Sequence, residues 1–308
     1  MITASAPGKV ILFGEHAVVF GRAALAVPVI QLQARVTVSE NSRGGIWIEA
    51  PNINLSSDIE QLPPDHPLAS VIYSVLSALS ESHPPACTIY IQSTIPVASG
   101  LGSGAAVSVA ILRALSAYLG QPLPDEQVNK LAFEAEKLHH GTPSGIDNTV
   151  ITYTKPVYFI KGRPVKTFHV GTPFTIVIGD TGISAPTKES VRSVRKLWET
   201  DKPRWEKVFD RVGNIVWDAR QAIERGDLTD LGNLMNANHV LLQKMTVSCP
   251  ELDRLVEAAR KSGAYGAKLS GGGRGGNMIT LVKKENAPAM AEALKSAGAK
   301  RTTVTQVE

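Results

Sequence analysis

The chain has 308 residues, of which 43% are hydrophobic and 19% are charged, so it can bury a substantial core in one large domain or two ordinary ones. Its 32 basic and 28 acidic residues leave a formal net charge of +4, which suits anionic small molecules and is too small and scattered to indicate nucleic-acid binding. No apolar run approaches the ~20 residues of a membrane span, no signal peptide is recognisable and only two cysteines occur, so we expect a cytoplasmic protein without membrane association.

Hydrophobic periodicity predicts an alternation of strands and helices along the chain. The predicted strands cover 32–38, 46–48, 87–93, 150–153, 157–160, 165–168, 174–179, 267–269, 277–282 and 301–307. The predicted helices cover 67–79, the run that follows residue 106, 125–140, a mostly helical block over 187–262, and 287–297. Because the first part begins with strands and the second is dominated by helices, we expect two domains, 1–170 and 171–308.

A glycine-rich run over 95–106 lies between a predicted strand and a long predicted helix. Its three glycines, Gly100, Gly102 and Gly104, leave backbone N–H groups uncovered where the helix dipole adds partial positive charge. This pattern is typical of a phosphate-binding loop. Close packing at the start of the helix is an alternative reason for the glycines, whereas a dinucleotide-binding turn is disfavoured because residues 94–99 separate the strand from them.

Two carboxylates, Glu136 and Asp147, flank a turn rich in glycine and proline over 141–145. The turn directs the second carboxylate back towards the end of the helix that carries the first. Near a phosphate-binding loop, such a pair suggests one ligand for magnesium and one group that handles a proton. A solvated turn at the end of a helix is the alternative.

Two further segments combine charge with an apolar or glycine-rich context. Lys9, Glu15 and His16 stand in an apolar segment near the start of the chain, where charged side chains are costly to bury without partners. A second glycine cluster over 270–276 contains Arg274 and suggests a backbone that is approached closely. Surface placement is the alternative for both.

Together these segments resemble the motifs of the GHMP family of small-molecule kinases. Residues 6–21 resemble its first motif, 96–106 its second and 268–277 its third. The form Gly14-Glu15-His16-Ala17-Val18-Val19 and the run over 136–148 are most similar to the mevalonate kinase branch. The resemblance implies an α+β fold of two domains: an N-terminal, ATP-binding domain like ribosomal protein S5 over 1–170, and a C-terminal ferredoxin-like domain over 171–308.

The resemblance also implies an activity, which is phosphorylation of the 5-hydroxyl of mevalonate with ATP and Mg²⁺. The expected partners are mevalonate and ATP, without nucleic acid or membrane, and a homodimer is left open. The alternatives are another GHMP kinase, acting on phosphomevalonate or a sugar, and a nucleotide-binding regulator of the same fold without turnover. The presence of Lys9, Glu136 and Asp147 disfavours the regulator, because a binding module needs none of them.

The site residues follow from the same resemblance. Asp147 would take the proton of the substrate hydroxyl, Lys9 would stabilise the alkoxide, and Glu136 with Ser103 would hold magnesium. The expected substrate-binding residues are Glu15, His16, Thr181, Thr187 and Arg274. The expected ATP-binding residues are Pro96, Ala98, Ser99, Gly100, Leu101, Gly102, Ser103, Gly104 and Ala105.

Two positions depart from the family pattern. Gly104 stands where the family usually has the serine that binds magnesium, so Ser103 or a water molecule must take its place. Arg274 stands in a loop where glycine is more usual. Its guanidinium suits bidentate contact with the substrate carboxylate or the transferred phosphate, and a side chain that points into solvent is the alternative.

Overall fold

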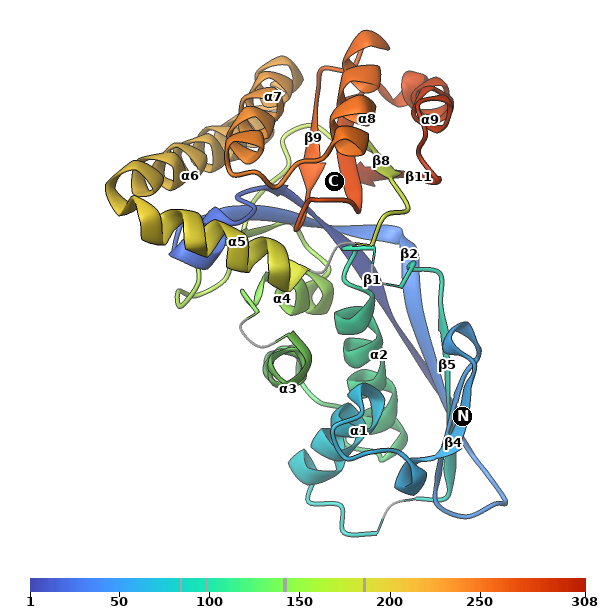
Figure 1. Cartoon of the computed structure of the whole chain (residues 1–308). Helices are drawn as coiled ribbons and strands as arrows, with labels where there is room; N and C mark the ends of the chain where they lie inside the picture. The colour runs from blue at the N-terminus through green and yellow to red at the C-terminus, as the bar shows by residue number, and fades with distance from the viewer. Residues whose placement is uncertain (84, 98, 141–142, 185–186) are drawn as a thin grey trace. The chain divides into compact units, whose positions relative to one another are not determined.

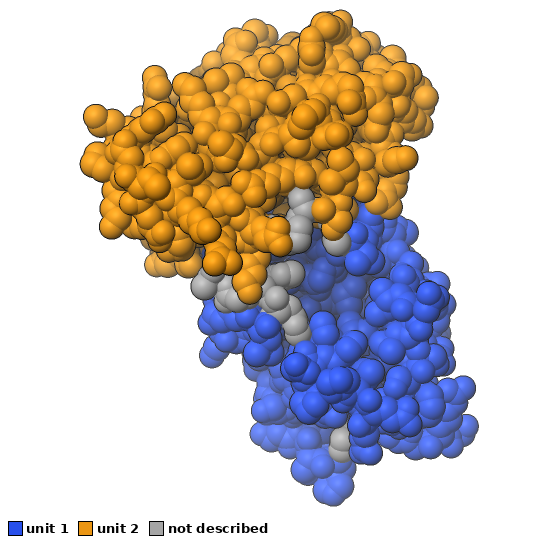
Figure 2. All heavy atoms as spheres, in the orientation of Figure 1, with its two compact units in different colours: residues 1–8, 32–97, 101–154 blue, residues 9–31, 98–100, 155–308 orange. Residues whose placement is uncertain are grey.

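The computed structural model describes residues 1–83, 85–97, 99–140, 143–184 and 187–308, without the side chains of residues 139 and 140. The chain divides into two compact units, which Figure 2 shows in different colours. Unit 1 comprises Met1–Gly8, Leu32–Val97 and Leu101–Thr154, and unit 2 comprises Lys9–Gln31, Ala98–Gly100 and Lys155–Glu308. The domain boundary that we expect at 170/171 stays a prediction. Within the described ranges, none of the helices is both long and apolar enough to cross a bilayer.

The sheet of unit 1 is built from strands whose alternation is visible in the sequence. Its strands are parts of β1 (Ile2–Phe13) and β2 (Ala24–Glu40), and the whole of β3 (Ile46–Ala50), β4 (Leu55–Asp58) and β5 (Cys87–Ser93). β5 lies between β2, to which it is antiparallel, and β3, to which it is parallel, and β4 pairs with the far side of β3. Val36, Val38, Ile89 and Ile91 are buried while their neighbours in sequence are more exposed, as a sheet with one covered face requires.

Four helices complete unit 1: α1 (Pro67–Ala78), α2 (Ser103–Tyr118), α3 (Asp125–His140) and α4 (Ile146–Tyr153). α2 is central, since it contacts β5 and each of the other three helices. Its residues Val109, Ile111, Leu112 and Leu115 are completely buried. The helix that carries the glycine-rich run at its start is therefore fixed in the core of the unit.

The strand predicted over 150–153 is wrong, because these residues form the second half of α4. Val150, Ile151 and Thr152 are β-branched and favour strands when they are taken alone. Gly145, at φ 92°, supports the helix start, and its carbonyl accepts a 2.7 Å hydrogen bond from the Thr149 hydroxyl. α4 then buries its apolar residues in contact with α2 and α3, so tertiary packing overrides local propensity.

The second half of unit 2 is a four-stranded antiparallel sheet covered by helices (Figure 1). Its strands are β8 (Phe174–Asp180), β9 (Gly266–Ser270), β10 (Asn277–Val282) and β11 (Arg301–Val307), in the order β11-β8-β10-β9. α8 (Pro250–Lys261) packs on β9 and β10, and α9 (Ala287–Ser296) packs on β8 and β11. This succession of strand, helix, strand, strand, helix and strand is the ferredoxin-like arrangement expected for the C-terminal part.

The remaining elements of unit 2 are the first residues of β2, which pair with β6 (Val157–Phe159), then β7 (Lys166–Thr167), α5 (Thr187–Thr200), α6 (Lys202–Arg225) and α7 (Leu228–Lys244). The long helix α6 has clear signals at both ends. Asp201 accepts a hydrogen bond from the backbone of Arg204 at its start, and Gly226, at φ 73°, ends it in the left-handed conformation. α7 packs between α6 and β9 and so links the helical block to the sheet.

Candidate active site

The glycine-rich run leads directly into α2, as the sequence predicts. Gly102 is the N-cap residue, at φ 76°, and as a glycine it has no side chain that could cap the helix. The backbone N–H groups at the start of a helix have no partner within the helix, and the N-cap residue supplies none here. Ser103 is half-buried and Gly104 is exposed, so this end of α2 can receive an anion.

Position 104 faces the candidate magnesium ligand within unit 1. A Cβ atom at Gly104 would lie 3.6 Å from Oε1 of Glu136. The serine that the family usually carries at this position would therefore stand beside the Glu136 carboxylate. In the described part of the chain, no group of three or more His, Cys, Asp or Glu residues could hold a metal ion by itself. One carboxylate supplemented by substrate phosphates is an arrangement that fits magnesium.

Asp147 lies in the first turn of α4, and the next residue ties that helix to α3. Asn148 is 3% exposed, and its Nδ2 donates to Oδ1 of Asn129 at 2.5 Å and to the Asn129 carbonyl at 3.2 Å. Asn129 and Glu136 are seven residues apart on α3, about two helical turns, so they lie on the same face. The amide contact thus fixes the helix of Asp147 relative to the helix of Glu136.

In unit 2, the three motifs meet at Ser99 and Gly100. Lys9 is 4% exposed, and its Nζ donates to the Gly100 carbonyl at 3.0 Å. Asn277, the first residue of β10, donates from Nδ2 to the Ser99 carbonyl. A lysine of the first motif and an amide of the third therefore hold the start of the glycine-rich run from two directions.

His16 is a buried, neutral imidazole with one unused nitrogen. It is 5% exposed, its backbone has φ 61°, and its Nε2 donates to the Gly272 carbonyl at 3.1 Å. Burial lowers the pKa of His16 to about 4, so the ring is uncharged at neutral pH. Its Nδ1 is buried and has no hydrogen-bond partner among the described residues. In this tautomer Nδ1 is an acceptor.

Glu15 pairs with a residue to which the sequence reasoning gave no role. Its carboxylate accepts from Nζ of Lys268, and neither side chain has any exposed surface. Thr181 is also occupied, since its hydroxyl donates to the Gly276 carbonyl at 3.0 Å and accepts from the Ile183 backbone at 3.2 Å. These contacts fix the two residues within the framework of unit 2.

Thr187 borders the second glycine cluster, and Arg274 lies within it. Thr187 begins α5, and a Cβ atom at Gly272 would lie 3.1 Å from its hydroxyl oxygen. Arg274 has φ 60°, and its backbone N–H donates to the Val247 carbonyl at 2.7 Å. Its Nε makes a long 3.4 Å hydrogen bond to the Thr246 carbonyl, just beyond the end of α7.

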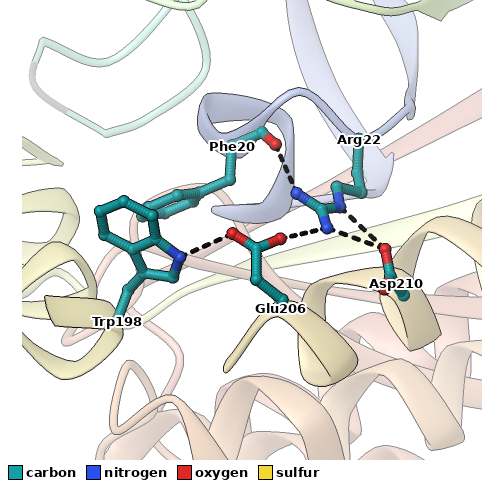
Figure 3. A network of polar contacts seen from close by, with 5 residues as sticks. All are labelled: Phe20, Arg22, Trp198, Glu206 and Asp210. Atoms are coloured by element: carbon teal, nitrogen blue, oxygen red, sulfur yellow. Dashed lines mark hydrogen bonds and ion pairs between the residues drawn. The ribbon is translucent and has the colours of Figure 1, made fainter. Parts of the chain in front are cut away.

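Helix α5 is anchored at the end opposite Thr187 by the network in Figure 3. Arg22 donates to Glu206, and to Oδ1 of Asp210 at 3.1 and 2.8 Å. Trp198 of α5 donates from Nε1 to the same Glu206 carboxylate at 2.7 Å. Phe20 accepts from Arg22 through its carbonyl, and its ring lies 5.6 Å from that of Trp198. The network therefore connects α5 and α6 to Phe20 and Arg22, at the end of the first motif.

Several predicted residues contribute through their backbone or cannot be assessed. Leu101 and Ala105 have buried side chains, so only their main chains could face a ligand, whereas Pro96 is half-buried. Ala98 lies outside the described residues. Lys9 and Asp147 belong to different units, and their action as a pair stays a prediction.

Sequence reasoning missed the roles of Lys268, Asn277 and Asn148. Lys268 is completely buried between Ala267 and Leu269, which are buried as well. A lysine within an apolar strand next to a glycine cluster is the same signal that singles out Lys9. The two asparagines carry no comparable signal, because their partners are distant in sequence.

The fold and these two groups of residues define a small-molecule kinase, and the chain belongs to the GHMP kinase family. The model of the GHMP kinase N-terminal domain matches residues 70–155, and that of the C-terminal domain matches residues 219–300. The family resemblance and the two-domain α+β fold are thereby confirmed.

Within the family, mevalonate kinases are among the most similar relatives. That of Pyrococcus horikoshii is 40% identical over 315 residues, covering 96% of this chain and 93% of the relative. That of Thermococcus gammatolerans is 37% identical over 316 residues, covering 96% and 93%. The crystal structure of L. major mevalonate kinase in complex with R-mevalonate has a TM-score of 0.86 and 33% identity, covering 99% of this chain and 95% of that one.

Proposed function

We propose that this enzyme phosphorylates the 5-hydroxyl of mevalonate with ATP, giving 5-phosphomevalonate and ADP. The observation that carries the proposal is the 40% identity over 96% of the chain to a relative named mevalonate kinase. A phosphomevalonate kinase of Streptococcus pneumoniae has a TM-score of 0.84 but only 18% identity, so that likeness concerns the fold alone.

The start of α2 is the part of unit 1 that would hold the phosphates of ATP. Uncapped backbone N–H groups at Ser103, Gly104 and Ala105 match phosphate oxygens, and the helix dipole favours their charge. Glu136, beside position 104, would hold Mg²⁺ together with Ser103. The metal ion supplies neutralisation of the charge on the transferred phosphate.

Asp147 would accept the proton of the substrate hydroxyl, and Lys9 would stabilise the negative charge that forms on the hydroxyl oxygen. The contact between Asn148 and Asn129 supports this role, because it fixes the start of α4 on α3. The hydrogen bond from Lys9 to the Gly100 carbonyl likewise fixes the direction of its ammonium group.

The unused acceptor of His16 makes this residue the best-supported substrate contact. Nδ1 is buried, unprotonated and without a described partner, so a donor on the substrate, such as a hydroxyl, would satisfy it. Thr187 supplies an exposed hydroxyl across Gly272 from His16. We propose that Arg274 adds charge for an anionic group of the substrate.

Release of ADP tests this function directly. The protein, with ATP and Mg²⁺, is supplied with mevalonate, phosphomevalonate, galactose or no acceptor. Of these acceptors, we expect only mevalonate to cause ADP release. Faster release with another acceptor, or release that does not depend on any acceptor, would contradict the proposal.

Asp147→Asn should lower kcat by roughly 10²–10⁴-fold, the usual contribution of a positioned acid or base. Asp125→Asn, at an exposed helix start in the same unit, is the matched control.

A homodimer stays a prediction, which the mass of the purified protein in solution tests.

A further inference from the structure

The ion pair between Glu15 and Lys268 is completely buried and joins two segments that are 253 residues apart. Nζ of Lys268 donates to Oε1 of Glu15 and to the Leu269 carbonyl, the latter at 2.6 Å. Removal of both charges from water is costly, and burial raises the pKa of Glu15 and lowers the pKa of Lys268, each opposed by the charge of the other. A pair of well-packed apolar residues would serve stability at least as well. The pair therefore calls for a reason other than stability.

The pair is one of three contacts between the first motif and residues 268–272. In the second contact, Ser270 donates from its hydroxyl to the Ile11 carbonyl at 2.8 Å. In the third, His16 donates to the Gly272 carbonyl at 3.1 Å. Ile11 belongs to β1, which ends at Phe13, and Glu15 and His16 follow that strand. The first motif is thus joined to residues 268–272 at three points, and along the first motif the ion pair lies between the other two.

The residue next to Glu15 has a backbone that needs such support. His16 has φ 61°, and a residue other than glycine pays about 1–2 kcal/mol for the left-handed region. A conformation of this kind persists only where its surroundings hold it. Lys268 donates both to Glu15 in the first motif and to the Leu269 carbonyl in its own strand. These two hydrogen bonds fix the peptide that carries His16. The same lysine holds the start of the loop whose Gly272 carbonyl receives the His16 ring.

We propose that Lys268 is a positioning residue, which through its ion pair with Oε1 of Glu15 holds the His16 ring with Nδ1 towards the substrate and does not itself contact the substrate. The inference rests on the proposed function only in that the substrate is taken to be mevalonate. It adds a positioning role for Glu15 to the substrate contact that the family resemblance suggests, since Oε2 of Glu15 is buried without a partner among the described residues, and it gives Lys268 a role.

The test must remove the charges without leaving one of them buried and unpaired. Lys268→Met alone would strand the Glu15 carboxylate, so the main variant is the double variant Glu15→Gln/Lys268→Met, in which both groups are neutral and of similar volume. Glu15→Gln alone is a milder second variant, because the amide oxygen can still accept from Nζ. Arg220→Met/Glu224→Gln is the matched control, since it removes a 2.8 Å ion pair of the same unit on α6.

Two readouts distinguish positioning from a merely structural role. The first is steady-state kinetics, in which kcat/KM for mevalonate should fall about tenfold or more in the double variant, while KM for ATP stays within about twofold. The second is the ¹⁵N spectrum of the imidazoles, with His16 assigned from the spectrum of His16→Gln. The unmodified protein should show the single tautomer protonated at Nε2, and the double variant should show a mixture. Glu15→Gln should give smaller changes in the same directions, and the control should match the unmodified protein in both readouts.

The outcomes separate the inference from the function on which it rests. A folded double variant with unchanged kinetics and a single His16 tautomer would overturn the positioning role. If the double variant does not fold, unchanged tautomer and kinetics in Glu15→Gln would overturn it as well. If the unmodified protein does not phosphorylate mevalonate, the proposed function fails, and the tautomer comparison still decides whether the pair positions His16.

Discussion

Replacement of Gly273 by alanine tests why the second glycine cluster consists of glycines. Gly273 has φ 72°, and a Cβ atom there would lie 1.9 Å from the Val247 carbonyl oxygen. The left-handed backbone alone costs an alanine about 1–2 kcal/mol. Relief of the contact requires the carbonyl to move by more than an ångström, which breaks its 2.7 Å hydrogen bond from the Arg274 backbone. A buried group left unpaired costs about 1–3 kcal/mol more. We therefore expect a total of about 2–5 kcal/mol.

The matched control is Gly271→Ala, because Gly271 has φ 87° but no atom of the described residues within 4 Å of its Cβ position. It should lose only the backbone term, about 1–2 kcal/mol. In thermal unfolding, at roughly 2–4 °C per kcal/mol for a large domain, Gly273→Ala should therefore unfold several degrees below Gly271→Ala. Equal midpoints would refute the reasoning that Gly273 is needed for packing against the segment at Val247.

Two further predictions concern the site, and a third concerns two buried histidines, His16 and His239, the latter hydrogen-bonded to Asp253. Gly104→Ser should lower the Mg²⁺ concentration for half-maximal rate about threefold, because its hydroxyl would lie beside Glu136; an unchanged magnesium dependence would show that position 104 does not face the metal. Arg274→Gly should raise KM for mevalonate and leave KM for ATP unchanged if the guanidinium holds the substrate carboxylate, and wild-type values of kcat and both KM would contradict a role in anion binding. His16 and His239 have a pKa of about 4 in the folded chain because of burial, against about 6.5 when unfolded, so only the unfolded chain takes up their protons between these values. The free energy of unfolding should therefore fall by up to about 3 kcal/mol per histidine as the pH drops from 6.5 to 4. A denaturant series in which the free energy of unfolding stays constant over that range would contradict this.

Much of the fold is predictable because its elements have local signals. Alternation in β2, β3 and β5, the proline and the histidine cap at the start of α1, and Asp201 and Gly226 around α6 each fix an element without knowledge of the rest. The wrong strand prediction at α4 has a different cause. Its sequence Val150-Ile151-Thr152 favours a strand, and only contact with α2 and α3 makes it a helix.

The candidate site divides in the same way. The glycine-rich run, Glu136 and Asp147 stand out by residue type and spacing, and the placement of Gly104 beside Glu136 supports the alignment of the second motif. The partner of Glu15 could not be predicted, because Lys268 reaches it through a fold that brings distant segments together. The glycine cluster was expected to admit a ligand, whereas Gly273 and Gly275 are also required by close backbone neighbours within unit 2.

The measurement that tests the account most directly is identification of the product by ³¹P NMR after reaction of the protein with ATP, Mg²⁺ and mevalonate. Phosphorylation of the 5-hydroxyl predicts a single new phosphomonoester resonance that grows in proportion to ADP. It should show coupling to the two protons on C5 and be absent from the Asp147→Asn reaction over the same time. Formation of inorganic phosphate in its place, or a phosphomonoester that appears equally fast with Asp147→Asn, would contradict the account.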